Sequence, residues 1–257
     1  MTRITCGLVI YDEIQEVQKL IPLLEKELQN FQVDWIFVLN HEQSEIRKWV
    51  QSWLVDNVRG PLTCFENPLN NLGFARQIIL EHSKNELIYL TDPDIQLLPK
   101  SIVKLIEYAQ LPTSDLKIAG YGGTVKHISD KPFLNQTFEL MAFLSKSLPF
   151  AFQIQNHSRE ALVDHIPACH LLLRKSAALE IGGFCYRQPR CGEDIDFTHR
   201  AFNLGYSFVF LPNSQVLHWQ NISIPLWYYK MFSFGQAQIR VQKKTTVWVF
   251  GITDCFH

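Results

Sequence analysis

Between residues 4 and 125, short apolar runs alternate with segments whose apolar residues recur at the helical spacing. This alternation is typical of βα units, which build an α/β fold around a mainly parallel sheet. Strands buried on both faces read as unbroken apolar stretches. The expected strands are residues 4–10, 35–39, 62–65, 87–90 and 118–122.

The first expected helix has its apolar residues on one stripe, with Pro22 as a kink or a restart. That stripe consists of Ile14, Val17, Ile21, Leu24 and Leu28. Further helices are expected at residues 44–54, 74–83 and 100–109.

Beyond residue 125 the alternation fades, and we expect a loop up to about residue 164 with one helix near 137–145. Regular structure is then expected to return. The predicted elements are a strand at 166–173, a short helix ending at Gly182 and Gly183, a helix at 193–204, and strands at 206–211 and 215–219. Because no internal repeat or low-complexity linker is visible, we predict one domain.

Composition excludes several classes of protein. The 257 residues are 47% apolar, which suffices for a substantial core. The 24 basic and 25 acidic residues are spread along the chain and show no footprint for nucleic acid. Six cysteines without a C-x-x-C pair fit a reducing cytosol. With no signal-peptide pattern and no run of eighteen apolar residues, we expect a cytoplasmic protein that does not span a membrane.

Two carboxylates, Asp92 and Asp94, stand directly after the expected strand 87–90. Mg²⁺ and Mn²⁺ take oxygen ligands, and they usually combine one or two carboxylates with the oxygens of a bound diphosphate. The pair therefore predicts a site for a divalent metal and a phosphate. The alternative is a turn closed by an Asx hydrogen bond.

A second acidic cluster, residues 193–196, opens the helix expected at 193–204. Asp194 falls near the middle of the apolar side, which it shares with Ile195, Phe197, Ala201, Phe202 and Leu204. Four other polar positions, Glu193, Asp196, Arg200 and Asn203, fall opposite. An inward carboxylate is costly unless it is paired or faces a cleft, so Asp194 is a candidate general base. The alternative is that these acids only favour the helix dipole and cap free N–H groups.

Three further features are candidates. His218 lies near the end of the last expected strand. It is a candidate metal ligand, because imidazole is a common third ligand beside carboxylates. The alternative is an ordinary histidine whose hydrogen bonds are satisfied within the protein. Asn71 and Gly73 precede a helix carrying Arg76, so N–H groups and a guanidinium can meet a phosphate or a base. Gly123, in a Gly120-Tyr121-Gly122-Gly123 run, permits close backbone approach to a ligand or forms a plain turn.

Taken in order, these motifs resemble family 2 glycosyltransferases of the GT-A fold, with a leaning toward the rhamnosyltransferase-like members. The resemblance covers residues 4–230. Its features are strand 7–11, Asn71 to Arg76, Asp92-Pro93-Asp94 as the family's DxD, Ile181 to Phe184 with Gly192 to Asp196, and Gly205-Tyr206 leading through Leu211-Pro212 to His218.

The resemblance implies an inverting transferase that moves a sugar from a UDP- or dTDP-sugar to a glycan or lipid-linked acceptor in surface polysaccharide synthesis. It implies that Mn²⁺ or Mg²⁺ binds Asp94, with His218 as a further ligand and Asp92 near the ribose or the metal. Asp194 maps onto the catalytic base. Glu193 and Trp219 adjoin these positions.

The chain departs from the family after its first two expected strands, where it reads Tyr11-Asp12-Glu13 and Asn40-His41-Glu42. Tyr11, Asn40 and Arg76 are therefore candidates for contacting a uracil or thymine base.

The resemblance also suggests a division of the chain. Residues 1–125 would form the nucleotide-sugar half, 126–220 the acceptor and catalytic half, and 221–257 a helical tail. Residues 222–232 are aromatic-rich, and basic residues follow them. This segment predicts either peripheral contact with the inner face of a membrane or a helix packed on the domain or on a partner chain, as in a homodimer.

Two rival functions remain open on sequence. A DxD phosphohydrolase would use Asp92 as its nucleophile, although such enzymes place that motif on their first strand. A binding module that has lost turnover would suit the departures at Tyr11-Asp12-Glu13 and Asn40-His41-Glu42.

Overall fold

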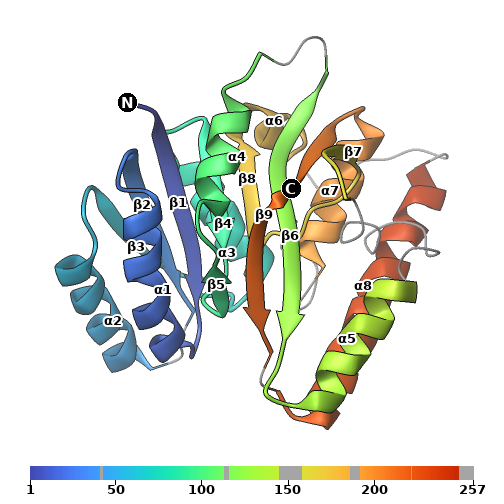
Figure 1. The fold of residues 1–257 in the computed structure, drawn as a ribbon, viewed down its shortest axis with the longest axis horizontal. Coiled ribbons are helices and arrows are strands. Elements are labelled where there is room, and N and C mark those ends of the chain that lie inside the picture. The colour runs from blue at the N-terminus through green and yellow to red at the C-terminus, as the bar shows by residue number, and fades with distance from the viewer. Residues whose placement is uncertain (41–42, 113–115, 145–157, 186–191, 221, 249–257) are drawn as a thin grey trace.

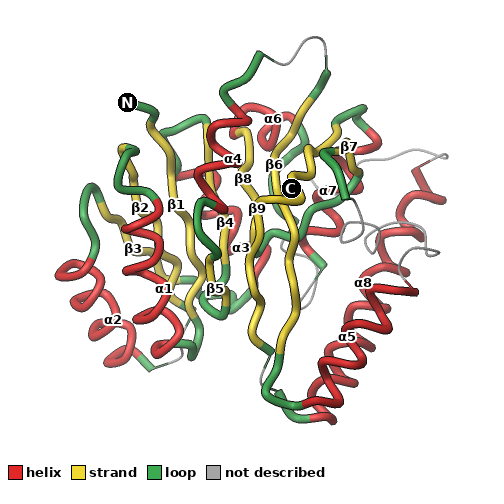
Figure 2. The backbone as a smooth tube through the Cα atoms, viewed as in Figure 1, coloured by secondary structure: helices red, strands yellow, loops and turns green. Residues whose placement is uncertain are grey.

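A central sheet with helices on both faces organises the chain (Figure 1). The computed structural model describes residues 1–40, 43–112, 116–144, 158–185, 192–220 and 222–248. The predicted α/β class is confirmed. Figure 2 shows the strands running through the middle of the molecule and the helices outside them.

The sheet contains nine strands in the order β3-β2-β1-β4-β8-β6-β9-β5, with β7 also paired to β9. Their bounds are β1 Arg3–Ile10, β2 Gln32–Leu39, β3 Leu62–Glu66, β4 Leu87–Thr91, β5 Ile95–Leu97, β6 Ile118–Ile128, β7 Ala161–Val163, β8 His170–Arg174 and β9 Ser207–Trp219. The strands β1 to β4 pair in parallel, and β8 runs antiparallel between β4 and β6. Since β9 is parallel to β6, the principal strands share one direction.

The helices connect and cover these strands. They are α1 Ile14–Glu27, α2 Ser44–Asn57, α3 Leu72–His82, α4 Ser101–Ala109, α5 Pro132–Leu144, α6 Lys175–Glu180, α7 Glu193–Asn203 and α8 Ile224–Trp248. Among the described helices, none combines the length and the apolar content that a bilayer crossing requires.

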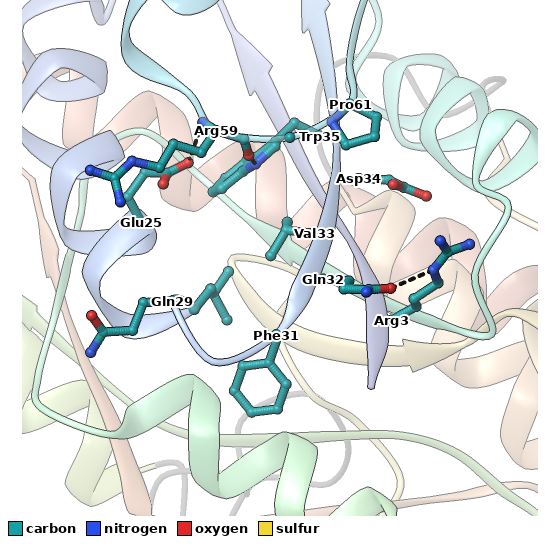
Figure 3. A pocket seen from close by; sticks show the side chains of 12 residues that line it. Arg3, Glu25, Gln29, Phe31, Gln32, Val33, Asp34, Trp35, Arg59 and Pro61 are labelled. Carbon is teal, nitrogen blue, oxygen red and sulfur yellow. Dashed lines mark hydrogen bonds between the residues drawn. The ribbon is translucent and has the colours of Figure 1, made fainter. Parts of the chain in front are cut away.

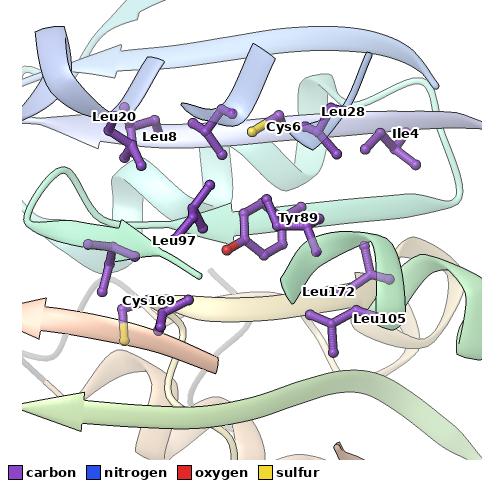
Figure 4. Close-up of a cluster of buried hydrophobic side chains, with 14 of the residues drawn as sticks. Ile4, Cys6, Leu8, Leu20, Leu28, Tyr89, Leu97, Leu105, Cys169 and Leu172 are labelled. Carbon is purple, nitrogen blue, oxygen red and sulfur yellow. The ribbon is translucent and has the colours of Figure 1, made fainter. Parts of the chain in front are cut away.

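The two faces of the sheet bury two separate apolar clusters. On β1, alternate residues such as Cys6 and Leu8 pack toward α1 and α4, in the cluster drawn in Figure 4. Val9, the next residue of β1, belongs to the cluster that includes Ile79 of α3 and Phe197 of α7. Period-two alternation within an all-apolar run therefore supplies both cores.

Three expectations beyond residue 125 were wrong, and so was the alternative that the first helix restarts at Pro22. The expected loop contains the end of β6 and a longer helix, α5, and the two expected strands at 206–211 and 215–219 form the single strand β9. Strand β8 starts at His170 rather than residue 166, because His170 N–H closes a turn onto Pro167. Pro22 does not interrupt α1, whose buried stripe continues past it.

Parallel strands deliver their carboxyl ends to one edge of the sheet, which we call the carboxyl edge. Tyr11 follows β1, Asn40 follows β2, Asp92 follows β4 and Gln220 follows β9. Ligands of open α/β sheets bind outside this edge. The fold thus brings residues from four distant segments to one place.

Gly123 of β6 is a point of close backbone contact with β9. The pairing of β6 with β9 shifts register between Gly123 and Thr124. A Cβ atom at Gly123 would collide with the carbonyl oxygen of Ser214 and lie 2.8 Å from that of Leu211. The glycine that the sequence offered as a ligand contact or a turn is therefore inside a strand and against backbone.

We expect Gly123→Ala to lower the free energy of unfolding by about 1–3 kcal/mol, because the methyl group overpacks a strand interface. Denaturant unfolding measures the change. Gly235→Ala on α8 is the matched control, since nothing lies within 4 Å of its added Cβ. Helix propensity should make the control stabilising by up to about 1 kcal/mol. Equal stability of the two variants would contradict the assigned role of Gly123.

Candidate active site

The carboxylate of Asp94 and the imidazole of His218 are in direct contact. His218 Nε2 lies 3.0 Å from Asp94 Oδ2. The backbone holds the two residues together, since Ile95 pairs with His218 across β5 and β9 and Trp219 N–H donates to Asp94 O at 2.9 Å. The strand ladder therefore holds side by side two residues that the family resemblance implies as ligands of one metal.

The electrostatics of this pair favour opposite charges. Burial alone would raise the pKa of Asp94, but the charge of His218, its hydrogen bond and then Lys230 lower that pKa below its usual value. Burial would lower the pKa of His218, yet Asp94 and then Asp92 raise it. His218 Nδ1 is buried and has no hydrogen-bond partner among the described residues.

Two neighbours of the pair were missed by sequence reasoning. His127, opposite His218 in the β6–β9 pairing, has its ring 5.0 Å from the His218 ring. Burial and the charge of His218 lower the pKa of His127 to about 3, so this ring is neutral. Lys230 of α8 contributes positive charge near Asp94, His127 and His218. His127 was missed because β6 extends beyond its expected end, and Lys230 because α8 follows the last of the recognised motifs.

Arg76 of α3 joins the two acidic clusters. Its Nη2 donates to Asp92 Oδ1 at 2.9 Å, and its Nη1 is bound to Glu193 Oε1. The side chains of Arg76 and Glu193 are both 4% exposed, whereas that of Asp92 is 24% exposed. Arg76 was expected at a phosphate or base, but the structure engages its guanidinium with these two carboxylates.

The expected orientation of α7 was partly wrong. Ile195, Phe197 and Ala201 are buried as predicted. However, Glu193 and Asp196, placed by the helical wheel on the outer side, are also buried. The wheel assumed one buried side, but the start of α7 is enclosed where α3 packs against it, and arginines neutralise the acids: Arg76 pairs with Glu193, and Arg200 with Asp196.

The exposed end of α7 gives the second half of this correction. Phe202 and Leu204 were expected on the buried side, but both are about half exposed. They lie at the last turn and its cap, where α7 ends at Asn203 and Gly205 turns the chain into β9.

Asp194, between these buried acids, is half-buried and held by backbone N–H groups. Its Oδ2 accepts from Ala168 N–H at 3.3 Å, and its Oδ1 from its own neighbour Ile195 at 2.8 Å. Ala168 lies two residues before His170, which pairs with Thr91 at the end of β4. The loop before β8 therefore connects Asp194 to the strand end that carries Asp92 and Asp94.

Charges from both acidic clusters act on the buried thiol of Cys169. The pKa of Cys169 is raised well above its usual value, first by burial and then by the charges of Asp92, Asp94 and Asp194, while Arg76 acts in the opposite direction. Cys169 lies in the loop that binds Asp194. Together with Arg76, which binds Asp92 and Glu193, this loop connects the two acidic clusters noted in the sequence.

Tyr11 and Asn40 stand next to one another at the ends of β1 and β2. Burial raises the pKa of Tyr11, and the nearby side-chain amide of Asn40 opposes that rise. Asn40 is 5% exposed, and neither its amide oxygen nor its amide nitrogen has hydrogen-bond geometry to any described residue. A buried amide whose oxygen and nitrogen lack well-formed hydrogen bonds to the described residues is suited to a planar ligand edge.

Glu13, a third acid at this edge, was not singled out from sequence. Burial raises the pKa of Glu13, and the charges of Asp94 and Asp92 add to the rise. Its Oε2 accepts from Tyr11 N–H at 3.1 Å.

The remaining predicted residues have structural contacts. Asn71 caps α3 by accepting from Phe74 N–H at 3.0 Å. A Cβ on Gly73 would collide with the backbone oxygen of Cys185. Trp219 is partly exposed, and its Nε1 donates to Gln96 at 3.1 Å.

A divalent metal fits the donor chemistry of Asp94 and His218. Carboxylate and imidazole are both ligands of Mn²⁺, whereas Mg²⁺ would rely mainly on the carboxylate. The described residues contain no group of three or more His, Cys, Asp or Glu arranged to hold a metal. Two side chains leave most positions of a metal to other oxygens, as in sites completed by a diphosphate.

A different pocket, with a volume of about 330 Å³, lies at the opposite edge of the sheet. Figure 3 shows Arg3 and Gln32, the first residues of β1 and β2, hydrogen-bonded beside it at 2.7 Å. None of the residues predicted as site residues lines it.

The fold of the chain is similar to that of several solved structures. No protein-family model matches the chain, and no curated protein matches it in sequence. A mannosyltransferase, PcManGT from Pyrobaculum calidifontis, solved with GDP-Man and Mn²⁺, is similar in structure, with a TM-score of 0.63 and 15% identity over 95% of this chain. The chain has a GT-A-like glycosyltransferase fold.

Two further structures agree. GalNAc-T7 with UDP, GalNAc and Mn²⁺ has a TM-score of 0.59 and 11% identity over 87% of this chain. TarS residues 1–349 from S. aureus has a TM-score of 0.57 and 11% identity over 86% of this chain. The chain spans 64%, 45% and 60% of the three solved chains, respectively, so it corresponds to part of their length.

Proposed function

We propose that the chain is an inverting glycosyltransferase that uses a nucleotide-diphosphate sugar and a divalent metal. The observation that carries this proposal is that Arg76 binds both Asp92 and Glu193, the residue before Asp194. Asp94, two residues after Asp92, contacts His218, and the loop before β8 binds Asp194 through Ala168 N–H. Sugar transfer from a diphosphate requires ligands for a cation and a general base near them. The fold shared with nucleotide-sugar enzymes supports the same assignment.

In this mechanism Asp194 takes the proton of an acceptor hydroxyl, whose oxygen forms a bond to the anomeric carbon as the bond to the diphosphate breaks. Attack from the side opposite the leaving group inverts the anomeric configuration. The N–H groups of Ala168 and Ile195 orient the Asp194 carboxylate for this task. Arg76 keeps Glu193, and with it the first turn of α7, in position.

Asp94 and His218 would hold the cation, with Asp92 near the ribose or the metal. When bound, Mn²⁺ or Mg²⁺ would stabilise negative charge on the departing diphosphate. Lys230 adds a fixed positive charge at the same end of the site. The neutral His127 ring packs beside His218 and restricts its position.

We propose Tyr11 and Asn40 as the base contacts of a UDP- or dTDP-sugar. The amide of Asn40 can accept from an imide N–H and donate to the adjacent carbonyl of uracil or thymine. Asn71 and Gly73 would then shape the start of α3 beside the donor. Gly123 would contribute indirectly, by allowing β6 to pack against β9. Trp219 would lie next to the bound cation, because its N–H donates to Asp94 O. Residues 1–125 supply donor contacts and 126–220 acceptor contacts within one domain, with a glycan or lipid-linked saccharide of surface polysaccharide synthesis as the acceptor.

We expect Asp94→Ala to weaken Mn²⁺-dependent UDP binding by at least about tenfold, because one of two side-chain donors is lost. Titration calorimetry with UDP, with and without Mn²⁺, measures this change. Asp164→Ala provides a charge-matched control outside the pair. Unchanged UDP affinity in Asp94→Ala would reject the ligand role of Asp94.

The same titration separates the rival functions once a donor assay follows it. Sugar release from a UDP-sugar supports the transferase, and phosphate release from simple esters supports a phosphohydrolase. Binding without turnover supports an inactive module. The ion pair of Asp92 with Arg76 argues against Asp92 as a nucleophile, because the guanidinium already occupies one of its oxygens.

A further inference from the structure

Helix α8 carries an unusual share of the exposed apolar surface. Six of the twenty exposed large apolar side chains among the described residues belong to it. They are Ile224, Leu226, Tyr228, Tyr229, Phe232 and Ile239. Single exposed apolar residues are ordinary on protein surfaces, but a contiguous group marks an interaction site.

Most of this group forms a stripe along the helix. At 100° per residue, Ile224, Tyr228, Phe232 and Ile239 fall within an arc of about 80°, and 15 residues of helix extend for about 22 Å. Tyr228 is 59% exposed and Phe232 is 65% exposed. We call these four residues the outer stripe.

The other side of α8 is attached to the rest of the protein. Trp227 is buried, and α8 packs against α7. Lys230 lies close enough to Asp94 to affect its pKa. The outer stripe therefore lies on the side of α8 that faces away from the rest of the protein.

The charge of α8 identifies what this stripe fits. The helix sequence contains Lys230, Arg240, Lys243 and Lys244 and has no Asp or Glu. Parallel pairing with α8 of a second copy would bring two such basic segments together, which is unfavourable. An apolar stripe rich in aromatic residues within a basic helix is complementary to the interface of an anionic bilayer.

We propose that α8 rests on an anionic membrane surface through its outer stripe. Because β9 ends at Trp219 and α8 begins at Ile224, this contact would hold the end of β9, with His218, near the lipid headgroups. If the proposed function is right, the site then opens close to where a lipid-linked acceptor resides. The membrane contact itself does not depend on that chemistry.

Vesicle co-sedimentation of the full chain, without nucleotide or metal, tests the proposal. We expect binding to vesicles of phosphatidylcholine containing about one third phosphatidylglycerol, weaker binding to phosphatidylcholine alone, and loss of binding at high salt. Phe232→Ser should weaken the partition by at least about tenfold. Leu179→Ser, which removes an exposed apolar side chain of α6, is the control and should change nothing.

Failure to bind anionic vesicles, or equal binding by Phe232→Ser and the unaltered chain, would overturn the proposal. Sedimentation velocity without lipid gives a third overturning result, namely a dimer that Phe232→Ser dissociates, which would assign the stripe to a second copy. Thermal shift with UDP and Mn²⁺ checks that Phe232→Ser remains folded. The same thermal shift also measures nucleotide binding. A variant that loses only the membrane contact keeps the shift with UDP and Mn²⁺, whereas failure of the proposed function removes that shift and leaves vesicle binding intact.

Discussion

Asp194→Asn is expected to lower the rate of sugar transfer by about 10²- to 10⁴-fold, the usual contribution of a general base. The amide cannot accept the acceptor's proton, but it retains the shape and an oxygen for the Ala168 N–H group. Donor affinity and stability should therefore change little. Release of nucleoside diphosphate from the donor, together with calorimetry of UDP and Mn²⁺, measures both sides of this expectation.

Asp196→Asn is the matched control for this substitution. It removes the same charge from the same helical turn, but the Asp196 carboxylate accepts from Arg200 at 2.8 Å. We expect Asp196→Asn to reduce stability while leaving kcat within about tenfold, the reverse of the Asp194 pattern. Near-normal turnover by Asp194→Asn would remove the base assignment.

Arg76→Met is expected to lower the free energy of unfolding by about 3–5 kcal/mol, because Glu193 would remain buried without its partner. Desolvation of the lone carboxylate, and not loss of attraction alone, sets this magnitude. Denaturant unfolding measures the loss. Since Arg76 also binds Asp92, UDP affinity should fall in the same variant.

Two further variants define the origin of that effect. Arg76→Met combined with Glu193→Leu removes both buried charges and should recover most of the lost stability. Lys117→Met breaks a pair with Glu180 in which both side chains are more than half exposed, so it should change the stability little. If Arg76→Met cost no more than Lys117→Met, the bridge would not be a stabilising element.

Sequence patterns predicted the first half of the fold well because its signals are local. The run at β1 and the stripe of α1 each follow directly from residue spacing, and the observed bounds differ by one or a few residues. The single strand β9 was not predictable in this way. Pro212 interrupts its apolar pattern, and only pairing with β6 across a register shift makes the two parts continuous.

The candidate site was predictable in its acids but not in its partners. Asp92, Asp94 and Asp194 are conspicuous because they stand at a strand end or face an apolar helix side. The burial of Glu193 depends on Arg76, 117 residues away in sequence, and no local period reports such a contact. His127 and Lys230 were missed for the same reason, since each reaches the site through tertiary packing.

The ladder between β5 and β9 has a consequence for how ligands would arrive. Its hydrogen bonds already fix the carbonyl of Asp94 and place His218 opposite Ile95. The conformational entropy of aligning this carboxylate and imidazole is therefore lost when the chain folds and not when a guest enters. A ligand that binds to Asp94 and His218 therefore finds both side chains already aligned, and its affinity is not reduced by the entropy cost of aligning them.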